Sequence, residues 1–279
     1  SLIQDTDDNW VEKGYFGSQS AVRRISKDLT YKDPRFELEV LQLLESNGIA
    51  VPKILQDSED SVIMSLIPGS HLGHNQITRY HCNEAGKVLA QIHAISTQDL
   101  QNTSKRSIDT ELQLVVDHQE DMKDFYQGAG DEFLADGSRA YQLTQSLQST
   151  ETPSILHNDY RLQNILWNGT AISGVLDFDW VTTGPAVKDL AHSLVEWSRA
   201  DGALDFNKDV MDWFLEGYNH VSERQYDLDQ NLVDWMWISA LSDACTFLYR
   251  MYQQGVTRIT PDKSYMYHKA QDVKKLLDS

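Results

Sequence analysis

The residue types best suited to chemistry lie in one stretch of the chain, residues 155–189. Asp159 and Asn164 are five positions apart, and Asp177 directly follows a short apolar run. The Asn-Gly pair at positions 168–169 lies between them and favours a tight hairpin turn, because both residue types tolerate positive φ angles. A hairpin would gather two carboxylates and an amide oxygen at one end, where they suit a hard cation such as Mg²⁺ that takes its remaining ligands from phosphates. The stretch therefore predicts a site for a metal ion and a phosphorylated ligand.

The order of these residues is also that of a known catalytic set. In protein kinases, an Asp that accepts the substrate proton is followed by an Asn and a second Asp that hold the metal. The kinase triplet His-Arg-Asp is absent here, because Asn158 stands between His157 and Asp159. Asp179 stands where kinases have Gly after Asp-Phe. We expect His157 to orient the loop through a hydrogen bond rather than to transfer protons.

Three short motifs in this stretch resemble the aminoglycoside phosphotransferase and choline kinase family, which also includes homoserine, methylthioribose and fructosamine kinases. The resemblance covers the whole chain in outline and is tight over residues 155–191. The matching motifs are His157-x-Asp159-x₄-Asn164, Leu176-Asp177-Phe178 and Gly184-x₄-Asp189-Leu190-Ala191. We expect Asp189 to steady the start of a helix rather than to bind a ligand.

The resemblance implies an α+β, two-lobe protein-kinase-like fold with a small β-rich N-lobe and a larger, mainly helical C-lobe. It implies transfer of the γ-phosphate of ATP to a hydroxyl of a small molecule. Asp159 would accept or orient the hydroxyl proton, while Asn164 and Asp177 would hold Mg²⁺. The acceptor stays open among aminoglycoside, choline, homoserine and other metabolites.

The resemblance also assigns nucleotide-binding residues near the start of the chain. Arg23 stands where the family has a cation that holds the nucleotide phosphates, with Lys27 as a rival. Glu37 would pair with Arg23, and Glu39 is a competitor for that role. The adenine ring would bond backbone groups between Met64 and Ile67.

The N-lobe is expected to span residues 1–68 and the C-lobe residues 69–279, because Pro68-Gly69 breaks the chain after a strand-like run. Within the N-lobe, Asp33 and Pro34 are suited to begin a helix and Gly48 to end it. About twenty residues precede Arg23, fewer than two strands and a loop usually take. Either a strand is missing or the predicted strand register is wrong.

The chain carries 42 acidic and 24 basic side chains, for a formal net charge of −18. Such acidity argues against nucleic acid or an anionic membrane surface as a partner. It is compatible with a cationic acceptor that is attracted by an acidic rim, and equally with acidic faces that are merely solvated. The candidates for such a rim are Asp117, Glu120, Asp121, Asp124, Asp201 and Asp205.

Two cysteines far apart in the sequence, Cys82 and Cys245, indicate neither a disulfide framework nor a zinc site. The sequence shows no signal-peptide pattern and no apolar run long enough for a membrane span, so a cytoplasmic location is expected.

Two other classes of function are weighed beside the kinase. One is a catalytically silent kinase-like binding protein, favoured by an Arg at the phosphate position and by the short N-lobe. The other is a metal-dependent hydrolase that would use His157, Asp177 and Asp179. The hydrolase lacks a second histidine or a carboxylate cluster at ligand spacing.

Overall fold

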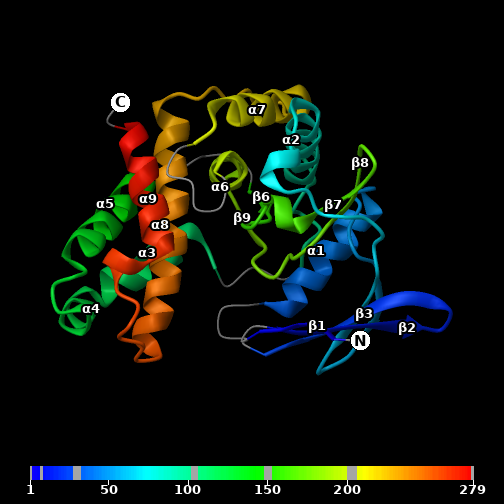
Figure 1. Cartoon of the computed structure of the whole chain (residues 1–279), viewed down its shortest axis with the longest axis horizontal. Coiled ribbons are helices and arrows are strands. Elements are labelled where there is room, and N and C mark those ends of the chain that lie inside the picture. Colours follow the sequence, from blue (N-terminus) through cyan, green and yellow to red (C-terminus); the bar gives the residue numbers. More distant parts are fainter. Residues whose placement is uncertain are drawn as a thin grey trace. The chain divides into compact units, whose positions relative to one another are not determined.

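The computed structural model describes residues 2–6, 9–27, 33–101, 106–147, 153–199 and 206–277 (Figure 1). The chain divides into two compact units, each built from three separate segments. Unit 1 comprises residues 1–105, 153–186 and 212–225, and unit 2 comprises residues 106–152, 187–211 and 226–279. The lobe boundary at residue 68 stays a prediction.

Unit 1 begins with a five-stranded antiparallel sheet in the order β1-β2-β3-β5-β4. A tight turn joins β2 to β3, and Gly17 within it has a positive φ of 62° that glycine adopts without steric cost. The strands are β1 (Leu2–Asp5), β2 (Asn9–Phe16), β3 (Gln19–Ser26), β4 (Ile54–Asp57) and β5 (Val62–Ser65).

Strand β1 explains how a complete sheet fits into so few residues. The sequence pattern indicated strand-like material only from residue 10 onward, yet β1 pairs with β2, with Asp5 opposite Trp10. Strand β1 is thus the strand that the sequence pattern overlooked. The predicted register of β3 is wrong by one residue, as the ion pairs of the site demonstrate.

Helix α1 (Pro34–Ser46) follows the sheet's first three strands and begins and ends as its sequence predicts. The Asp33 side chain accepts a hydrogen bond from the Phe36 backbone N–H at 3.4 Å, and Pro34 is the first helical residue. Gly48, just past the helix, has a φ of 82°. This helix matters for function because it carries Glu37, which is buried.

The remainder of unit 1 combines short strands with two helices. Helices α2 and α7 lie close together, and glycines make this possible (Figure 1). A Cβ on Gly86 would lie only 2.2 Å from the Phe214 carbonyl oxygen, and a Cβ on Gly217 only 2.0 Å from the Asn83 carbonyl oxygen. The Tyr160 hydroxyl donates to the Ala85 carbonyl in α2 at 3.0 Å, which fixes the loop that carries Asp159. The elements are α2 (Arg79–His93), β6 (Ser154–Leu156), β7 (Ile165–Asn168), β8 (Ala171–Val175), β9 (Thr182–Gly184) and most of α7 (Lys208–Val221).

The regular secondary structure in the described part of unit 2 is helical. Helix α8 is buried on nearly all sides and packs against α3, α5 and α9, as its apolar sequence predicts. The helices are α3 (Ile108–Asp117), α4 (Gln119–Tyr126), α5 (Asp131–Leu147), α6 (Ala186–Ser198), α8 (Gln230–Gln253) and α9 (Tyr265–Leu277). Among the described residues, none of the helices has the length and apolar character needed to cross a membrane.

Candidate active site

The loop before β7 brings the first two predicted residues together. The Asn164 side-chain amide donates to the Oδ2 atom of Asp159 at 2.8 Å and to the Asp159 backbone carbonyl at 2.8 Å. A short 3₁₀ turn over Leu162–Asn164 sets this geometry. The amide oxygen of Asn164 takes no part in either bond. It is the kind of oxygen ligand that a hard cation binds.

Arg161 occupies the turn between these two residues. Its Nε atom lies 3.1 Å from the Oδ1 atom of Asp159, and its side chain is 41% exposed. Asp159 therefore has a partner on each carboxylate oxygen. Sequence reasoning missed Arg161, although its position two residues after Asp159 was visible.

His157 orients the loop, as predicted from the sequence. Its Nε2 atom lies 2.9 Å from the Leu176 carbonyl oxygen, and its Nδ1 atom lies 3.2 Å from the Asp159 backbone nitrogen. Because the backbone N–H can only donate, Nδ1 is the acceptor and Nε2 carries the proton. The ring also packs against Phe178 at a centroid distance of 4.4 Å. Both nitrogens are engaged by backbone groups, which removes His157 as a ligand for the hydrolase alternative.

Hairpin β7–β8 delivers Asp177 beside this loop. Residues 168 and 171 pair across its turn, where Gly169 has a φ of 62°, so the predicted hairpin is confirmed. Leu176 then ties the two segments together: its N–H donates to the Asn164 carbonyl at 2.8 Å, and its carbonyl bonds His157. The next residue, Asp177, has a φ of 64°, a left-handed conformation that is uncommon for a residue other than glycine. Asp177 thus has a strained backbone and directly follows the residue whose N–H bonds Asn164.

A buried ion-pair network joins the sheet and α1 to the segment after β8. Arg24 in β3 donates to both oxygens of Glu37, at 2.8 and 2.5 Å, and to Oδ1 of Asp179 at 2.6 Å. The Asn9 side chain donates to Oδ2 of Asp179 at 2.5 Å. Burial opposes the charge of Arg24, but Glu37 and Asp179 outweigh it and raise the pKa of the guanidinium.

A family model described as the phosphotransferase enzyme family matches residues 6–224 of the 279-residue chain. The chain belongs to this family. A homoserine kinase of Pseudomonas aeruginosa (strain UCBPP-PA14) is 25% identical over 185 residues, which are 62% of this chain and 57% of that protein. The alignment thus spans little more than half the length of these curated relatives.

Two solved structures share the fold. One is a choline kinase from Cryptosporidium parvum Iowa II, with a TM-score of 0.71 and 16% identity over 100% of this chain and 89% of that one. The other is a spectinomycin phosphotransferase in complex with ADP and spectinomycin, with a TM-score of 0.65 and 17% identity over 100% and 89% of the two chains. The predicted kinase-like α+β fold is therefore confirmed.

Within this phosphotransferase-family fold, the pairing predicted for the N-terminal cation is wrong by one residue. Glu37 pairs with Arg24, whereas Arg23 lies 3.8 Å from Glu12 and bonds Ser61 at 3.2 Å. Successive side chains of a strand point to opposite faces, so a one-residue error moves the cation to the other side of the sheet. The rivals are engaged elsewhere: Lys27 pairs with Asp5, and Glu39 accepts from the Gln101 N–H.

Asp179 is the second residue whose role sequence reasoning missed. It is buried, and it stands in place of the glycine of the protein-kinase motif. Its carboxylate forms an ion pair with Arg24. The only available signal was this departure from the kinase pattern, which does not identify a partner 155 positions away.

The two residues that bound the predicted adenine site lie in and just after strand β5. Met64 lies in β5, is 8% exposed and pairs with Val22 of β3. Ile67 follows β5 and packs against Gly174. A Cβ on that glycine would lie 2.7 Å from the Cδ1 atom of Ile67. Their role in binding adenine stays a prediction.

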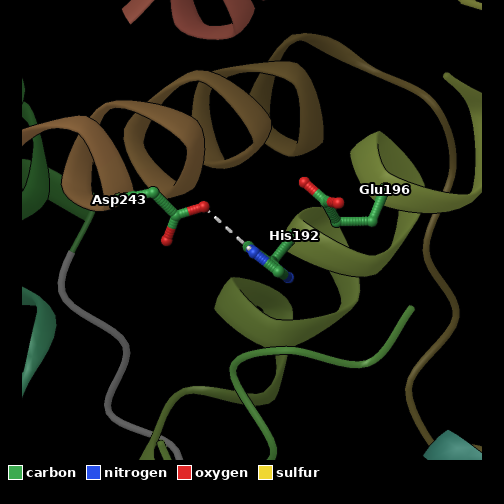
Figure 2. A group of neighbouring side chains, drawn as sticks. All are labelled: His192, Glu196 and Asp243. Atoms are coloured by element: carbon green, nitrogen blue, oxygen red, sulfur yellow. Dashed lines mark hydrogen bonds and ion pairs between the residues drawn. The ribbon is translucent and has the colours of Figure 1, made fainter. Parts of the chain in front are cut away.

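A separate group in unit 2 has the residue types of a metal site. His192 and Glu196 of α6 face Asp243 of α8, and the His192 Nε2 atom lies 3.1 Å from Oδ2 of Asp243 (Figure 2). The Nζ atom of Lys269 lies 2.6 Å from Glu196 and 3.1 Å from Asp243. An ammonium group therefore already fills the space between the carboxylates, and we read this group as a structural ion network.

The predicted acidic rim lies partly within the described residues. Asp117 ends α3, and Glu120, Asp121 and Asp124 lie in α4; all four are exposed. Asp201 and Asp205 lie outside the described residues. Any contribution of these acids to acceptor binding stays a prediction.

Proposed function

We propose that this chain transfers the γ-phosphate of ATP to a hydroxyl group of a small molecule. The observation that carries the proposal is the pair of backbone bonds made by Leu176. They hold Asp177 directly beside the loop in which Asn164 bonds Asp159. A base and two oxygen ligands held at fixed relative positions are what phosphoryl transfer requires, since its catalysis is mainly positioning and charge stabilisation.

In this proposal, Asp159 is the base. Its carboxylate accepts the proton of the acceptor hydroxyl while the hydroxyl oxygen forms a bond to the γ-phosphorus. The bond between that phosphorus and the β,γ-bridging oxygen breaks, and ADP leaves with the electron pair. The bond from Asn164 fixes the Oδ2 atom of the base throughout.

Asn164 and Asp177 are the proposed ligands of Mg²⁺. The donor set fits a hard cation: an amide oxygen and a carboxylate lie in a region where two further carboxylates, Glu37 and Asp179, surround a single guanidinium. When bound, Mg²⁺ would neutralise charge on the phosphate oxygens. Asp177 also acts electrostatically on Arg24, which supports its closeness to the nucleotide-binding side of the site.

Arg24, rather than Arg23, is the proposed nucleotide-side cation. Its Nε atom is buried and has no hydrogen-bond partner among the described residues. A phosphate oxygen would satisfy this donor while Glu37 and Asp179 keep the guanidinium in place. Met64 and Ile67 remain the proposed neighbours of the adenine ring.

The proposed location is the cytoplasm, and the state of the thiols supports it. Cys82 and Cys245 are both free and buried. Burial raises the pKa of the Cys82 thiol to about 12, so this side chain is unreactive at neutral pH.

The first experiment compares melting temperatures with Mg²⁺ alone and with Mg²⁺ plus ATP, and then measures ADP release. A panel of acceptors should contain homoserine, choline and spectinomycin, because the relatives and structural neighbours are named for acting on these or related compounds. A nucleotide-dependent shift with ADP release on one acceptor supports the kinase. A shift without turnover on any acceptor favours a catalytically silent binding protein, and no shift contradicts both.

A further inference from the structure

Both carboxylate oxygens of the proposed base already have partners. Oδ2 accepts from Asn164 at 2.8 Å, and Oδ1 lies 3.1 Å from the Nε atom of Arg161. An acceptor hydroxyl that donates to Asp159 must therefore displace or rearrange one of these contacts. The question is which of the two partners can leave.

Asn164 is the fixed partner. It is 6% exposed, and its side chain also bonds the Asp159 backbone carbonyl at 2.8 Å. Arg161 has a side chain that is 41% exposed, although its Nε atom is buried, and this atom approaches Asp159, which is 17% exposed, without hydrogen-bond geometry. An ion pair that has one partly exposed member and no hydrogen bond is held less firmly than the two hydrogen bonds of Asn164. The contact that can open is the one made by Arg161.

The charge balance of the site calls for a second cation near the transferred phosphate. Arg24 already faces the carboxylates of Glu37 and Asp179, so it adds no net positive charge to its surroundings. Arg161 touches the base itself and faces a single carboxylate in the described contacts. Its position beside the base suits it to stabilise the negative charge that develops between the acceptor and the γ-phosphate in the transition state.

We propose that Arg161 exchanges its contact with Asp159 for one with the γ-phosphate, so that nucleotide binding releases the Oδ1 atom for the acceptor hydroxyl. This inference rests on the proposed kinase function and adds a catalytic residue to it. The base is masked until the phosphate donor arrives, which couples nucleotide binding to competence for proton transfer.

The backbone permits this exchange without moving the loop. The Arg161 N–H donates to the Asp159 carbonyl at 3.0 Å, and its carbonyl accepts from the Asn164 N–H at 2.9 Å. The turn is therefore pinned at both ends while the long side chain can change rotamer. A guanidinium then offers two parallel N–H groups to a phosphate, which suits its planar geometry.

The first test compares the affinity of AMP-PNP with that of ADP, both with Mg²⁺, by calorimetry. Arg161→Gln should weaken AMP-PNP binding about tenfold to a hundredfold and leave ADP binding unchanged, because only the former carries a γ-phosphate. Arg161→Lys should recover part of the loss. The matched control is Arg79→Gln, which removes an exposed arginine from another ion pair, that with Glu216.

The second test is a double-mutant cycle that examines the exchange itself. If Arg161 must leave Asp159 to reach the phosphate, Asp159→Asn removes its competing partner and tightens AMP-PNP binding. The gain should shrink at least severalfold in the Arg161→Gln background, because the coupling runs through Arg161. Simple loss of repulsion between Asp159 and phosphate would give the same gain in both backgrounds.

The outcomes separate the two proposals. Suppose that the wild-type protein binds both nucleotides and that Arg161→Gln weakens the binding of AMP-PNP and ADP equally, or weakens neither. This result overturns the γ-phosphate contact and leaves the kinase proposal standing. An additive cycle overturns the exchange. Failure of the wild-type protein to bind either nucleotide overturns both proposals together.

Discussion

The side-chain nitrogen of Asn164 lies 2.8 Å from the Oδ2 atom of Asp159 and fixes the orientation of that carboxylate. One short bond thus links a proposed metal ligand to the proposed base. Removing Asn164 should impair metal binding, whereas removing Asp159 should impair proton transfer. The two effects can be distinguished by experiment.

Asp159→Ala should lose most turnover while the protein still binds Mg²⁺ and ATP. The loss of a positioned base lowers kcat by about 10²- to 10⁴-fold. The measurement is steady-state ADP release, with the ATP-dependent thermal shift as a check on binding. Asp121→Asn, at an exposed acid of α4, is the control. A near-normal kcat in Asp159→Ala would contradict its role as base.

Asp177→Asn should leave the backbone intact and change the demand for metal. The φ of 64° at this position is one that asparagine tolerates, so the variant removes mainly a formal charge. We expect activity to require a much higher Mg²⁺ concentration, measured as the half-saturating concentration at fixed ATP. An unchanged Mg²⁺ dependence would assign the ion to another residue.

The adjacent arginines of β3 offer a matched comparison of a buried and an exposed ion pair. Arg24→Gln leaves Glu37 and Asp179 as buried carboxylates without their counter-charge, which costs about 3–5 kcal/mol of folding free energy. Arg23→Gln removes a cation whose side chain is 44% exposed and should hardly change the melting temperature. Chemical denaturation of both variants measures the difference. Equal losses would contradict the register of β3.

Protonation of His192 should stabilise unit 2 at mildly acidic pH. Burial lowers the pKa of His192, but Asp243 and Glu196 outweigh burial and Lys269, and the net direction is upward. A raised folded-state pKa means that the stabilisation is complete below the unfolded value of about 6.5 and is lost as pH rises through the folded value. The melting temperature of the wild type should therefore fall across this range more steeply than that of His192→Gln. His220→Gln, at an exposed histidine of α7, is the control, and parallel pH profiles for all three proteins would contradict the prediction.

Ionic strength tests whether the acidic residues of α3 and α4 attract a cationic acceptor. Raising the salt concentration from about 10 mM to about 150 mM shortens the Debye length from roughly 30 Å to roughly 8 Å, so the KM of such an acceptor should rise. The KM of ATP should change less or in the opposite sense. A neutral acceptor with a salt-independent KM would show that Asp117 and its acidic neighbours are only solvated surface.

The hairpin of the candidate site could be predicted from the sequence, whereas the Arg24 network could not. Asp159, Asn164 and the turn at Gly169 lie within eleven residues, so covalent geometry and turn preferences largely decide where they go. Strand β3 gave no such guidance, because its two faces are both partly buried and its pattern does not reveal which arginine points inward. The bonds from Asp179 to Asn9 and Arg24 cross 170 and 155 positions and carry no local signal.

The discontinuous path of the chain through unit 1 has a consequence for biosynthesis. Its last segment, residues 212–225, supplies Gly217 and the Tyr218 hydroxyl that lies 2.7 Å from His93 of α2. A nascent chain can therefore carry the whole β7–β8 hairpin outside the ribosome while the face of α2 that receives α7 is still uncovered. Completion of unit 1 waits for residues made long after its first strand, as expected for a topology rich in distant contacts. We expect the emerging polypeptide to expose during that interval the apolar face of α2 that is buried in the folded chain.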